Sequence, residues 1–545
     1  MRSPAAAIAW EFRRRHRWGL IAVTGYLLVL AALKLLVFGP GHRVTFADEE
    51  TFAFFVMLPL TSTFLYFLAV FSFGLSGDLA GRESMYPARM FTLPVTTAAL
   101  AGWPMLYGTA AMAVMWLAMR LLALWPSGVA VPIVWPAMLA AALVAWTQAL
   151  TWMPYALRGL RVVVTIVWLT TIDSVVLLAL QFRAPEPVML AILAPLVPLA
   201  YLAARFAVAR ARRGDVPDWG GIFPRPGRTA GVAPRRRGRF PSPARAQAWF
   251  EWQQYGRSLP LLVGILLPFE LFMLFVFSKT PAIVFETLLA VLLTPPFMAS
   301  FVAATVSKSN SGGSDSYGVT PFIAARPLTN ASLIAAKLKV TISSTLVAWL
   351  LVLVAVPLAL RLTGTAPIVL ERWRRLIEVV GTPRAVAMVL LGLSAFLAST
   401  WKQLVQGLYI GMSGRQWAIK ASVFLTLSLL AVIGPIAHWV ITSRAVIRVL
   451  WNGFPWIAAV LVCFKMSVAA WIALRLHNKG LLSDRALVIG AACWAVAVFA
   501  IYGLFEWIVP GLLSRSYLLL FMAILAVPLV RLSAAPLALA RNRHR

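Results

Sequence analysis

The chain has 545 residues, of which 61% are hydrophobic and only 12% charged, and its mean hydropathy is +0.84. These values exclude an ordinary soluble globular protein and indicate an all-α, polytopic membrane protein. The formal net charge of +31 raises the question of a nucleic-acid partner, but the basic residues lie mostly between apolar runs, where they act as topology signals first.

The apolar runs predict about fourteen transmembrane helices, because about 20 apolar residues cross a bilayer. Their centres lie near residues 28, 63, 110, 141, 172, 197, 268, 293, 347, 392, 428, 463, 497 and 525. The basic stretch 13–17 should hold the N-terminus in the cytoplasm. When successive spans then cross the membrane in alternating directions, every strongly basic connector and the C-terminus also lie in the cytoplasm. We therefore expect a multi-pass protein of the cell membrane, or of the inner membrane if the source is bacterial.

The segment directly before the first span mixes Trp with charge, as WEFRRRHRWG at Trp10–Gly19, and a similar segment, WFEWQQYGRS at Trp249–Ser258, precedes a later span. Such a composition suits a helix that lies along the membrane interface, with its indoles at headgroup level. An ordinary flank of a membrane span is the alternative interpretation of either segment.

Two landmarks occur twice along the chain. LPVTTAALA at 93–101 and RPLTNASLIA at 326–335 share a Pro-x-Thr (PxT) turn before a long apolar run. A Trp-x-Gln followed by Gly recurs as Trp146, Gln148, Gly159 and as Trp401, Gln403, Gly414. Both pairs keep their order, which indicates two copies of one six-span unit. Six is an even number, so the copies should be parallel, with both PxT turns in the cytoplasm.

The repeat divides the chain into four parts. They are a first unit at 1–208, a basic cytoplasmic linker at 209–245, a second unit at 246–475, and two further spans with a basic tail at 476–545. From Arg210 to Arg245 the linker carries ten Arg against two Asp. We expect it to lie near anionic lipid headgroups rather than to bind nucleic acid, because it lacks interleaved aromatic residues.

Motifs for catalysis are absent from the sequence. It contains no GxxxxGK[ST], HExxH or GxSxG pattern, and its five histidines are scattered without metal-ligand spacing. Cys463 and Cys493 lie inside apolar runs, where a small hydrophobic thiol is the ordinary role. The glycine-rich stretch 307–318 lacks the Lys of a phosphate loop and is interpreted as a flexible connector. We therefore expect neither an enzyme nor a metal site.

Three charged residues lie near the centres of predicted spans, namely Asp173, Glu270 and Lys465. A charge at this depth is costly and tends to face the protein interior or a water-filled path. Asp173 or Glu270 could belong to a proton or substrate path. The structural alternative is an acid paired with Lys465 inside the bundle.

Two segments, Trp10–Trp18 and Trp249–Arg257, together with the two turns GDLAGRESMYPARMFTLPVTT and SDSYGVTPFIAARPLTNASLIAAKL, resemble parts of the type-2 permeases of ATP-binding-cassette (ABC) exporters. We call these two segments the elbow segments. In that family an interfacial elbow helix opens each six-span unit, and a cytoplasmic turn preceded by acidic residues leads into the third span. Lys337 stands where such permeases often have Lys, whereas the first half has Pro104. The resemblance covers about residues 1–475, and two fused units with two trailing spans depart from the commonest single-unit form.

The resemblance implies a pump whose ATP is hydrolysed by separate cytoplasmic ATPase subunits, two in number, with no cofactor on this chain. It also implies residues that contact or support those subunits. They are Glu11, Asp78, Arg82, Glu83 and Pro94 in the first half, and Glu251, Asp315 and Pro327 in the second. Both prolines also suit a simple helix start, because Pro is favoured in the first turn.

Two other classes of function stay open at this point. A self-sufficient secondary transporter or lipid flippase is compatible with fourteen spans and with the acids at 173 and 270. A membrane-embedded transferase fits less well, because the outer loops are short and lack clustered acids or histidines. The one sizeable outer loop, 362–384, contains ERWRRLIEVVG, which is typical of an interfacial amphipathic helix. Lipids, peptides, drugs and ions all remain open as substrates.

Overall fold

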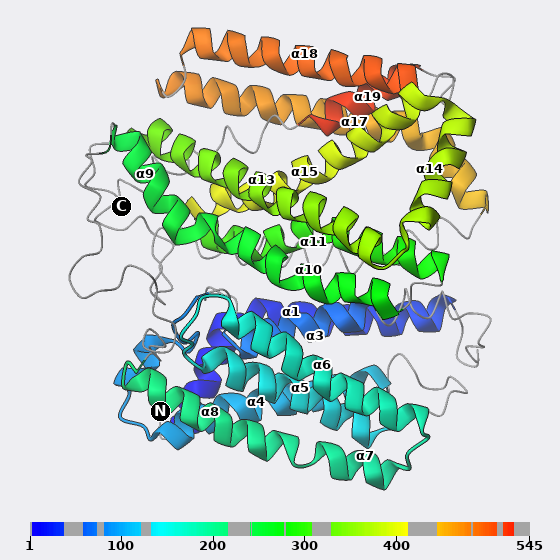
Figure 1. The fold of residues 1–545 in the computed structure, drawn as a ribbon. Helices are drawn as coiled ribbons and strands as arrows, with labels where there is room; N and C mark the ends of the chain where they lie inside the picture. The colour runs from blue at the N-terminus through cyan, green and yellow to red at the C-terminus, as the bar shows by residue number, and fades with distance from the viewer. Residues whose placement is uncertain are drawn as a thin grey trace, which may run out of the picture. The chain divides into compact units, whose positions relative to one another are not determined.

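A computed structural model of the chain describes residues 3–37, 58–73, 81–120, 132–215, 240, 242–276, 280–307, 329–412, 444–480, 483–508 and 516–527. Within these ranges every regular element is a helix, which confirms the all-α class (Figure 1). The described residues form two compact units by their contacts, one up to Asp215 and one from Phe240 onward. The division falls inside the predicted basic linker 209–245.

Unit 1 is a bundle of helices around one apolar core. Its elements are α1 (Pro4–Val37), α3 (Leu58–Phe71), the short 3-10 helix η3 (Ala88–Thr92), α4 (Thr97–Met119), α5 (Val134–Trp152), α6 (Leu160–Gln181), α7 (Glu186–Leu193) and α8 (Leu196–Arg212). Helix α5 packs against both α4 and α8, and α1 and α3 pack against α4. Small residues at the centre of α5, such as Ala145 and Ala149, are fully buried and allow this close approach.

Unit 2 contains the remaining described helices. They are α9 (Pro243–Glu251), the single π-helical turn η6 (Trp252–Gly256), α10 (Ser258–Val276), α11 (Pro281–Ser307), α13 (Asn330–Leu362), α14 (Ala366–Val380), α15 (Thr382–Met412), α17 (Arg444–Asn478), α18 (Asp484–Ile508) and α19 (Ser516–Ala526). Helix α11 packs against α15 and α10, and α10 packs against α13. The C-terminal pair α18 and α19 packs together, with α19 against α17.

Ten of these helices are long and apolar enough to cross a membrane, with α7 and α8 together counting as one. They cover the spans expected near 110, 141, 172, 197, 268, 293, 347, 392, 463 and 497. The spans expected near 28, 63 and 525 fall on α1, α3 and α19, which do not meet that test over the described residues. The span expected near 428 lies outside the described residues. Ten such helices are the mark of a multi-pass membrane protein.

The two predicted elbow segments differ in the structure. In the first half, residues 10–18 do not form a separate helix, because α1 runs without interruption from Pro4 to Val37. In the second half α9 ends at Glu251, and the π-turn η6 leads into α10, so that α9 meets α10 at an angle (Figure 1). Gly256 ends that turn, where an added Cβ would come within 2.9 Å of Val340 Cγ1. Only glycine allows the turn to approach α13 so closely.

Candidate functional site

The segment 81–92, which precedes the first PxT turn, is fixed through its backbone to the connection between α5 and α6. The amide of Met85 donates to the carbonyl of Thr151 at 3.2 Å, and the amide of Tyr155 donates to the carbonyl of Arg82 at 2.9 Å. The hydroxyl of Ser84 donates to the carbonyl of Trp152. Residues 66 to 73 positions apart in sequence therefore hold one stretch of chain in place.

A buried arginine completes this anchor. Arg161 is 1% exposed, donates to the carbonyl of Glu83, and lies 5.7 Å from the ring centroid of Tyr155. Burial raises the pKa of the Tyr155 phenol to about 12, although the charge of Arg161 lowers it. With the backbone held in this way, the side chains of Arg82 and Glu83 are exposed to the surroundings. Two of the predicted coupling residues thus present opposite charges from a fixed segment.

Tyr86 connects the same segment to the interior of α4. Pro104 has no N–H group, so the carbonyl of Leu100 lacks its usual donor four residues later. The hydroxyl of Tyr86 donates to that carbonyl at 2.8 Å. Burial raises the pKa of the Tyr86 phenol, so the hydroxyl keeps its proton for this bond. The carbonyl of Pro104 in turn accepts from Gln148 Nε2 at 3.1 Å.

Pro94 lies in the turn between η3 and α4. The N-cap of α4 is Thr96, whose hydroxyl accepts from the amide of Ala99 at 3.3 Å. Pro94 therefore lies two residues before the N-cap, and the interpretation of this proline as a first-turn residue of the helix is wrong. Its side chain and that of Leu93 are exposed on the turn.

Two basic residues hold the turn from either side. Arg89 Nη2 lies 2.6 Å from Glu11 Oε1 on α1, with both side chains partly exposed. Arg212, at the end of α8, donates to the carbonyl of Val95 at 2.9 Å and to that of Leu93 at 3.4 Å. The turn is thus bound both to the elbow segment of α1 and to the last helix of unit 1.

In unit 2 the elbow carboxylate also pairs with a basic residue near the PxT turn. Glu251 Oε2 lies 2.9 Å from Lys337 Nζ, and the two side chains are only 2% and 7% exposed. Gln247 donates to the other oxygen, Glu251 Oε1, at 2.8 Å, and Lys337 Nζ lies 5.0 Å from the ring centroid of Tyr255. The pair borders a small cavity whose wall also includes Thr341.

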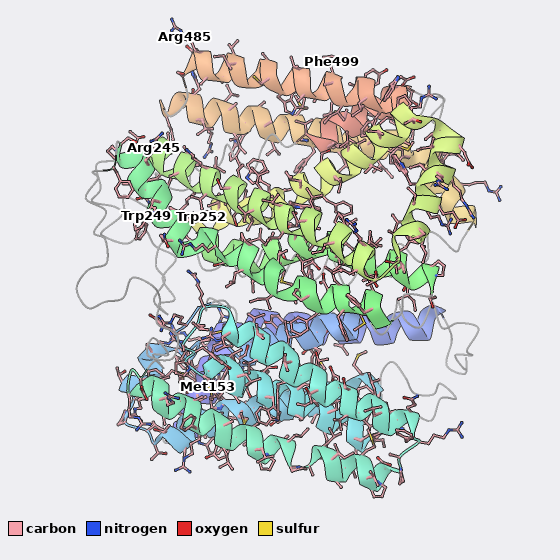
Figure 2. The ribbon with its side chains drawn as sticks, viewed as in Figure 1. Met153, Arg245, Trp249, Trp252, Arg485 and Phe499 are labelled. Carbon is pink, nitrogen blue, oxygen red and sulfur yellow. The ribbon has the colours of Figure 1, made fainter. Side chains whose placement is uncertain are left out.

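Thr329, the threonine of the second PxT turn, caps α13 as Thr96 caps α4. Its hydroxyl accepts from the amide of Ser332 at 3.2 Å. Trp249, on the last turn of α9, is 45% exposed, and Trp252 follows it on η6 (Figure 2). The predicted coupling residues Asp78, Asp315 and Pro327 lie outside the described residues.

The charges predicted near the centres of spans have separate surroundings. Asp173 is exposed on α6 in unit 1. In unit 2, Glu270 Oε1 accepts from the hydroxyl of Thr294 on α11, while Glu270 Oε2 is buried with no hydrogen-bond partner among the described residues. Lys465 Nζ donates to the backbone carbonyls of Ile524 at 2.6 Å, Leu525 at 3.1 Å and Val527 at 2.6 Å.

The expected pairing of an acid with Lys465 is therefore not seen among the described residues. The physical reason is that α19 ends beside Lys465, and the last carbonyls of a helix carry the partial negative charge that an ammonium group seeks. Within the described part of the chain, no group of three or more His, Cys, Asp or Glu side chains could hold a metal ion.

Sequence reasoning missed the partners that fix these segments, namely Tyr86, Arg89, Tyr155, Arg161 and Arg212. Their signal in the sequence is slight. Pro104 inside a predicted helix indicates that a carbonyl one turn earlier needs an outside donor, but not which residue supplies it. The three arginines are indistinguishable by pattern from the many topology-determining basic residues.

Comparison with known proteins adds no relative: no protein-family model, no curated protein and no solved structure matches this chain.

Proposed function

We propose that the chain is the membrane-spanning permease of an ATP-driven exporter of the ABC type, with two six-span units fused in one polypeptide. Separate cytoplasmic ATPase subunits, two in number, supply the energy. In this proposal the PxT turns and both termini face the cytoplasm, in a bacterial inner membrane if the source is bacterial. The last two spans, which include α18 and α19, are an addition to the second unit.

One observation carries the proposal. In each half a carboxylate of the elbow segment is ion-paired to a basic residue close to the PxT turn, Glu11 with Arg89 and Glu251 with Lys337. In each half the threonine of the turn also caps the following helix. A force that an ATPase applies to the turn is therefore transmitted both to the elbow segment and to the helix that follows the turn. A permease that is energised by a separate subunit requires such a connection.

Exposed charged side chains of the first half form the proposed contact with the ATPase. Arg82 and Glu83 project from a backbone held by Arg161 and Tyr155, in the segment that precedes the exposed turn at Pro94. A rigid, charged and exposed segment suits a partner that docks and undocks, because rim charges mainly set the association rate and the choice of partner.

The test is purification of the tagged chain from its native membranes, with measurement of ATPase activity in the eluate. We expect a nucleotide-hydrolysing protein to copurify, and its yield to fall severalfold when the two charges are exchanged in Arg82→Glu with Glu83→Lys. The matched control is Arg183→Glu with Glu186→Lys, an equal exchange on exposed residues, one between α6 and α7 and one at the first position of α7. Absence of any ATPase from the wild-type eluate, or equal loss with the control, contradicts the proposal.

A self-sufficient secondary transporter or lipid flippase is the second candidate, and one observation favours it. Glu270 lies within a predicted span, bonded to Thr294, with one carboxyl oxygen buried without a partner among the described residues. Acids in this position often belong to ion paths. If this candidate is right, the purified chain alone moves a fluorescent phospholipid across proteoliposomes under a pH gradient, and Glu270→Gln stops the movement without lowering the yield of folded protein.

A further inference from the structure

Helix α14 joins two predicted spans at the end of the bundle away from the PxT turn. Helix α13 starts beside that turn at Thr329 and ends at Leu362, and α15 follows α14. The chain bends at Gly364, before α14, and again at Gly381, after it, with φ of 68° and 82°, values that favour glycine. Figure 1 shows α14 running across the direction of α10 and α13. Its axis is thus set roughly parallel to the plane of a membrane that those helices cross.

The two faces of α14 differ in chemistry. Half-buried apolar side chains lie along one face, namely Val369, Trp373, Leu376, Ile377 and Val380, and Leu370 at its edge is 48% exposed. The other side carries the exposed charged side chains Glu371, Arg372, Arg374, Arg375 and Glu378, with the apolar Val379, 81% exposed, among them. No residue of α14 is fully buried. A helix whose apolar face is only partly covered by neighbouring helices, and whose other face is exposed and basic, is suited to a membrane surface.

The connector that contains α14 carries an excess of positive charge. Between Arg361 and Arg384 the sequence has five Arg and two Glu, and 5 − 2 gives a net charge of +3. Short loops on the side opposite the cytoplasm are normally poor in Lys and Arg. The ion pair described on α14 joins Glu371 to Arg375 within the helix, with both side chains more than half exposed, so it leaves the excess positive charge unchanged.

The height of α14 agrees with the position of lipid headgroups. From Val340 to Leu362, α13 spans 23 residues, or about 34 Å at 1.5 Å per residue. The hydrocarbon core is about 30 Å thick. When Val340 is placed at one boundary of the hydrocarbon core, Leu362 reaches the other boundary, and α14, which follows it, lies there.

We propose that α14 lies in the headgroup layer of the bilayer leaflet opposite the PxT turns and binds anionic phospholipids. This inference rests on the membrane assignment and not on an ATPase partner. The apolar face enters the acyl boundary, where Trp373 suits the interface. Arg372, Arg374 and Arg375 donate paired hydrogen bonds to lipid phosphates, which guanidinium groups match in geometry. Arg372 lies 5.7 Å from the ring centroid of Phe285 on α11, which holds one of these arginines close to the bundle.

The orientation of α14 is tested with spin labels on the full chain in lipid nanodiscs, after Cys463→Ser and Cys493→Ser. One label replaces Ile377 on the apolar face and one replaces Glu378 on the exposed face. We expect the label at 377 to be reached by oxygen from the lipid and the label at 378 by a water-soluble nickel chelate. Access of the chelate to both positions, or of neither reagent to either, overturns the proposal, since the latter would mean that protein covers the helix.

Lipid selectivity is tested by following the label at 377 while phosphatidylglycerol replaces phosphatidylcholine. We expect the label to move deeper as the anionic lipid increases. Arg372→Gln, Arg374→Gln and Arg375→Gln together should raise the fraction needed for half the change by about fivefold or more. The corresponding three Arg→Lys changes keep the charge and most of the response. A label at Val488 on α18, which is 65% exposed, is the control and should not respond. An unchanged response in the Gln variant overturns the proposal.

Discussion

At the scale of single residues, the pair Glu251–Lys337 differs from its counterpart Glu11–Arg89 in burial. The side chains of Glu251 and Lys337 are nearly inaccessible, whereas those of Glu11 and Arg89 are 31% and 47% exposed. Removing one partner of a buried pair leaves an uncompensated charge, but an exposed pair contributes little. The coupling segment of the second half should therefore depend far more on its ion pair than that of the first half.

The first prediction follows from this difference. Lys337→Met should lower the free energy of unfolding by about 3–5 kcal/mol, because Glu251 would stay buried without its counter-charge. Glu251→Gln combined with Lys337→Met should recover much of the loss. Arg89→Met should cost less than about 1 kcal/mol. Denaturant unfolding in detergent measures all three, and a similar cost for Lys337→Met and Arg89→Met would contradict the interpretation.

The second prediction concerns the carbonyl of Leu100, which lacks a helical donor because residue 104 is proline. Tyr86→Phe should destabilise the protein by about 0.5–1.5 kcal/mol, the usual contribution of such a hydrogen bond. In a Pro104→Ala background an amide is available to Leu100, and the effect of Tyr86→Phe should shrink toward zero. A double-mutant cycle measures the coupling between the two residues. Equal effects in both backgrounds would mean that Tyr86 acts through another contact.

The resemblance pointed to Glu11 and Glu251 as coupling residues, but nothing in the sequence predicted that they pair with Arg89 and Lys337. Arg89 and Lys337 lie 78 and 86 positions further along the chain, and such distances are set by how helices pack. For Lys465 the described residues show no acid partner, and a helix end satisfies an ammonium group as well as a carboxylate does. The sequence pattern gives no sign that α19 ends beside it.

At the scale of elements, Lys465 holds the end of α19 to α17. Its three hydrogen bonds reach carbonyls at the C-terminus of α19, which no amide of that helix can satisfy. Arg485, at the start of α18, and Phe499 mark the other helix of the C-terminal pair in Figure 2. The last helix, α19, is thus held to α17 partly through one lysine.

The third prediction is that Lys465→Met speeds hydrogen exchange in the last turn of α19 by about tenfold or more, since hydrogen bonds to a charged group each contribute about 1.5–3 kcal/mol. Exchange measured by mass spectrometry in detergent reports this region. Lys339→Met, which removes an exposed lysine on α13, is the control and should leave α19 unchanged. Unchanged exchange in the Lys465 variant would show that packing alone holds α19.

Predicted helices were found wherever the structure describes the chain, because long apolar runs leave few alternatives in a bilayer. The elbows were harder to predict. Nothing between Trp10 and Trp18 breaks a helix, so α1 continues through the first segment, whereas the second contains the π-turn that ends at Gly256. The difference depends on the contact of Gly256 with Val340, a residue 84 positions away whose proximity the sequence does not reveal.

At the scale of the whole molecule, the predicted linker coincides with the division into two units, since α8 ends at Arg212 and α9 begins at Pro243. The boundaries at 208 and 245 were placed slightly inside these helices. The end of the apolar pattern fixes such a boundary only to within a few residues. The parallel orientation of the two units, on which the proposed function depends, stays a prediction.

The most direct test of the central claim is therefore topology mapping in intact cells. Single cysteines are placed at Arg89 and Thr329, on the two PxT segments, and at Val379 on α14, in a chain with Cys463→Ser and Cys493→Ser. A membrane-impermeant thiol reagent is then applied from outside, before and after the membrane is opened. The account predicts labelling of 379 in intact cells, and of 89 and 329 only after opening. Labelling of 89 and 329 from opposite sides of the membrane would contradict it.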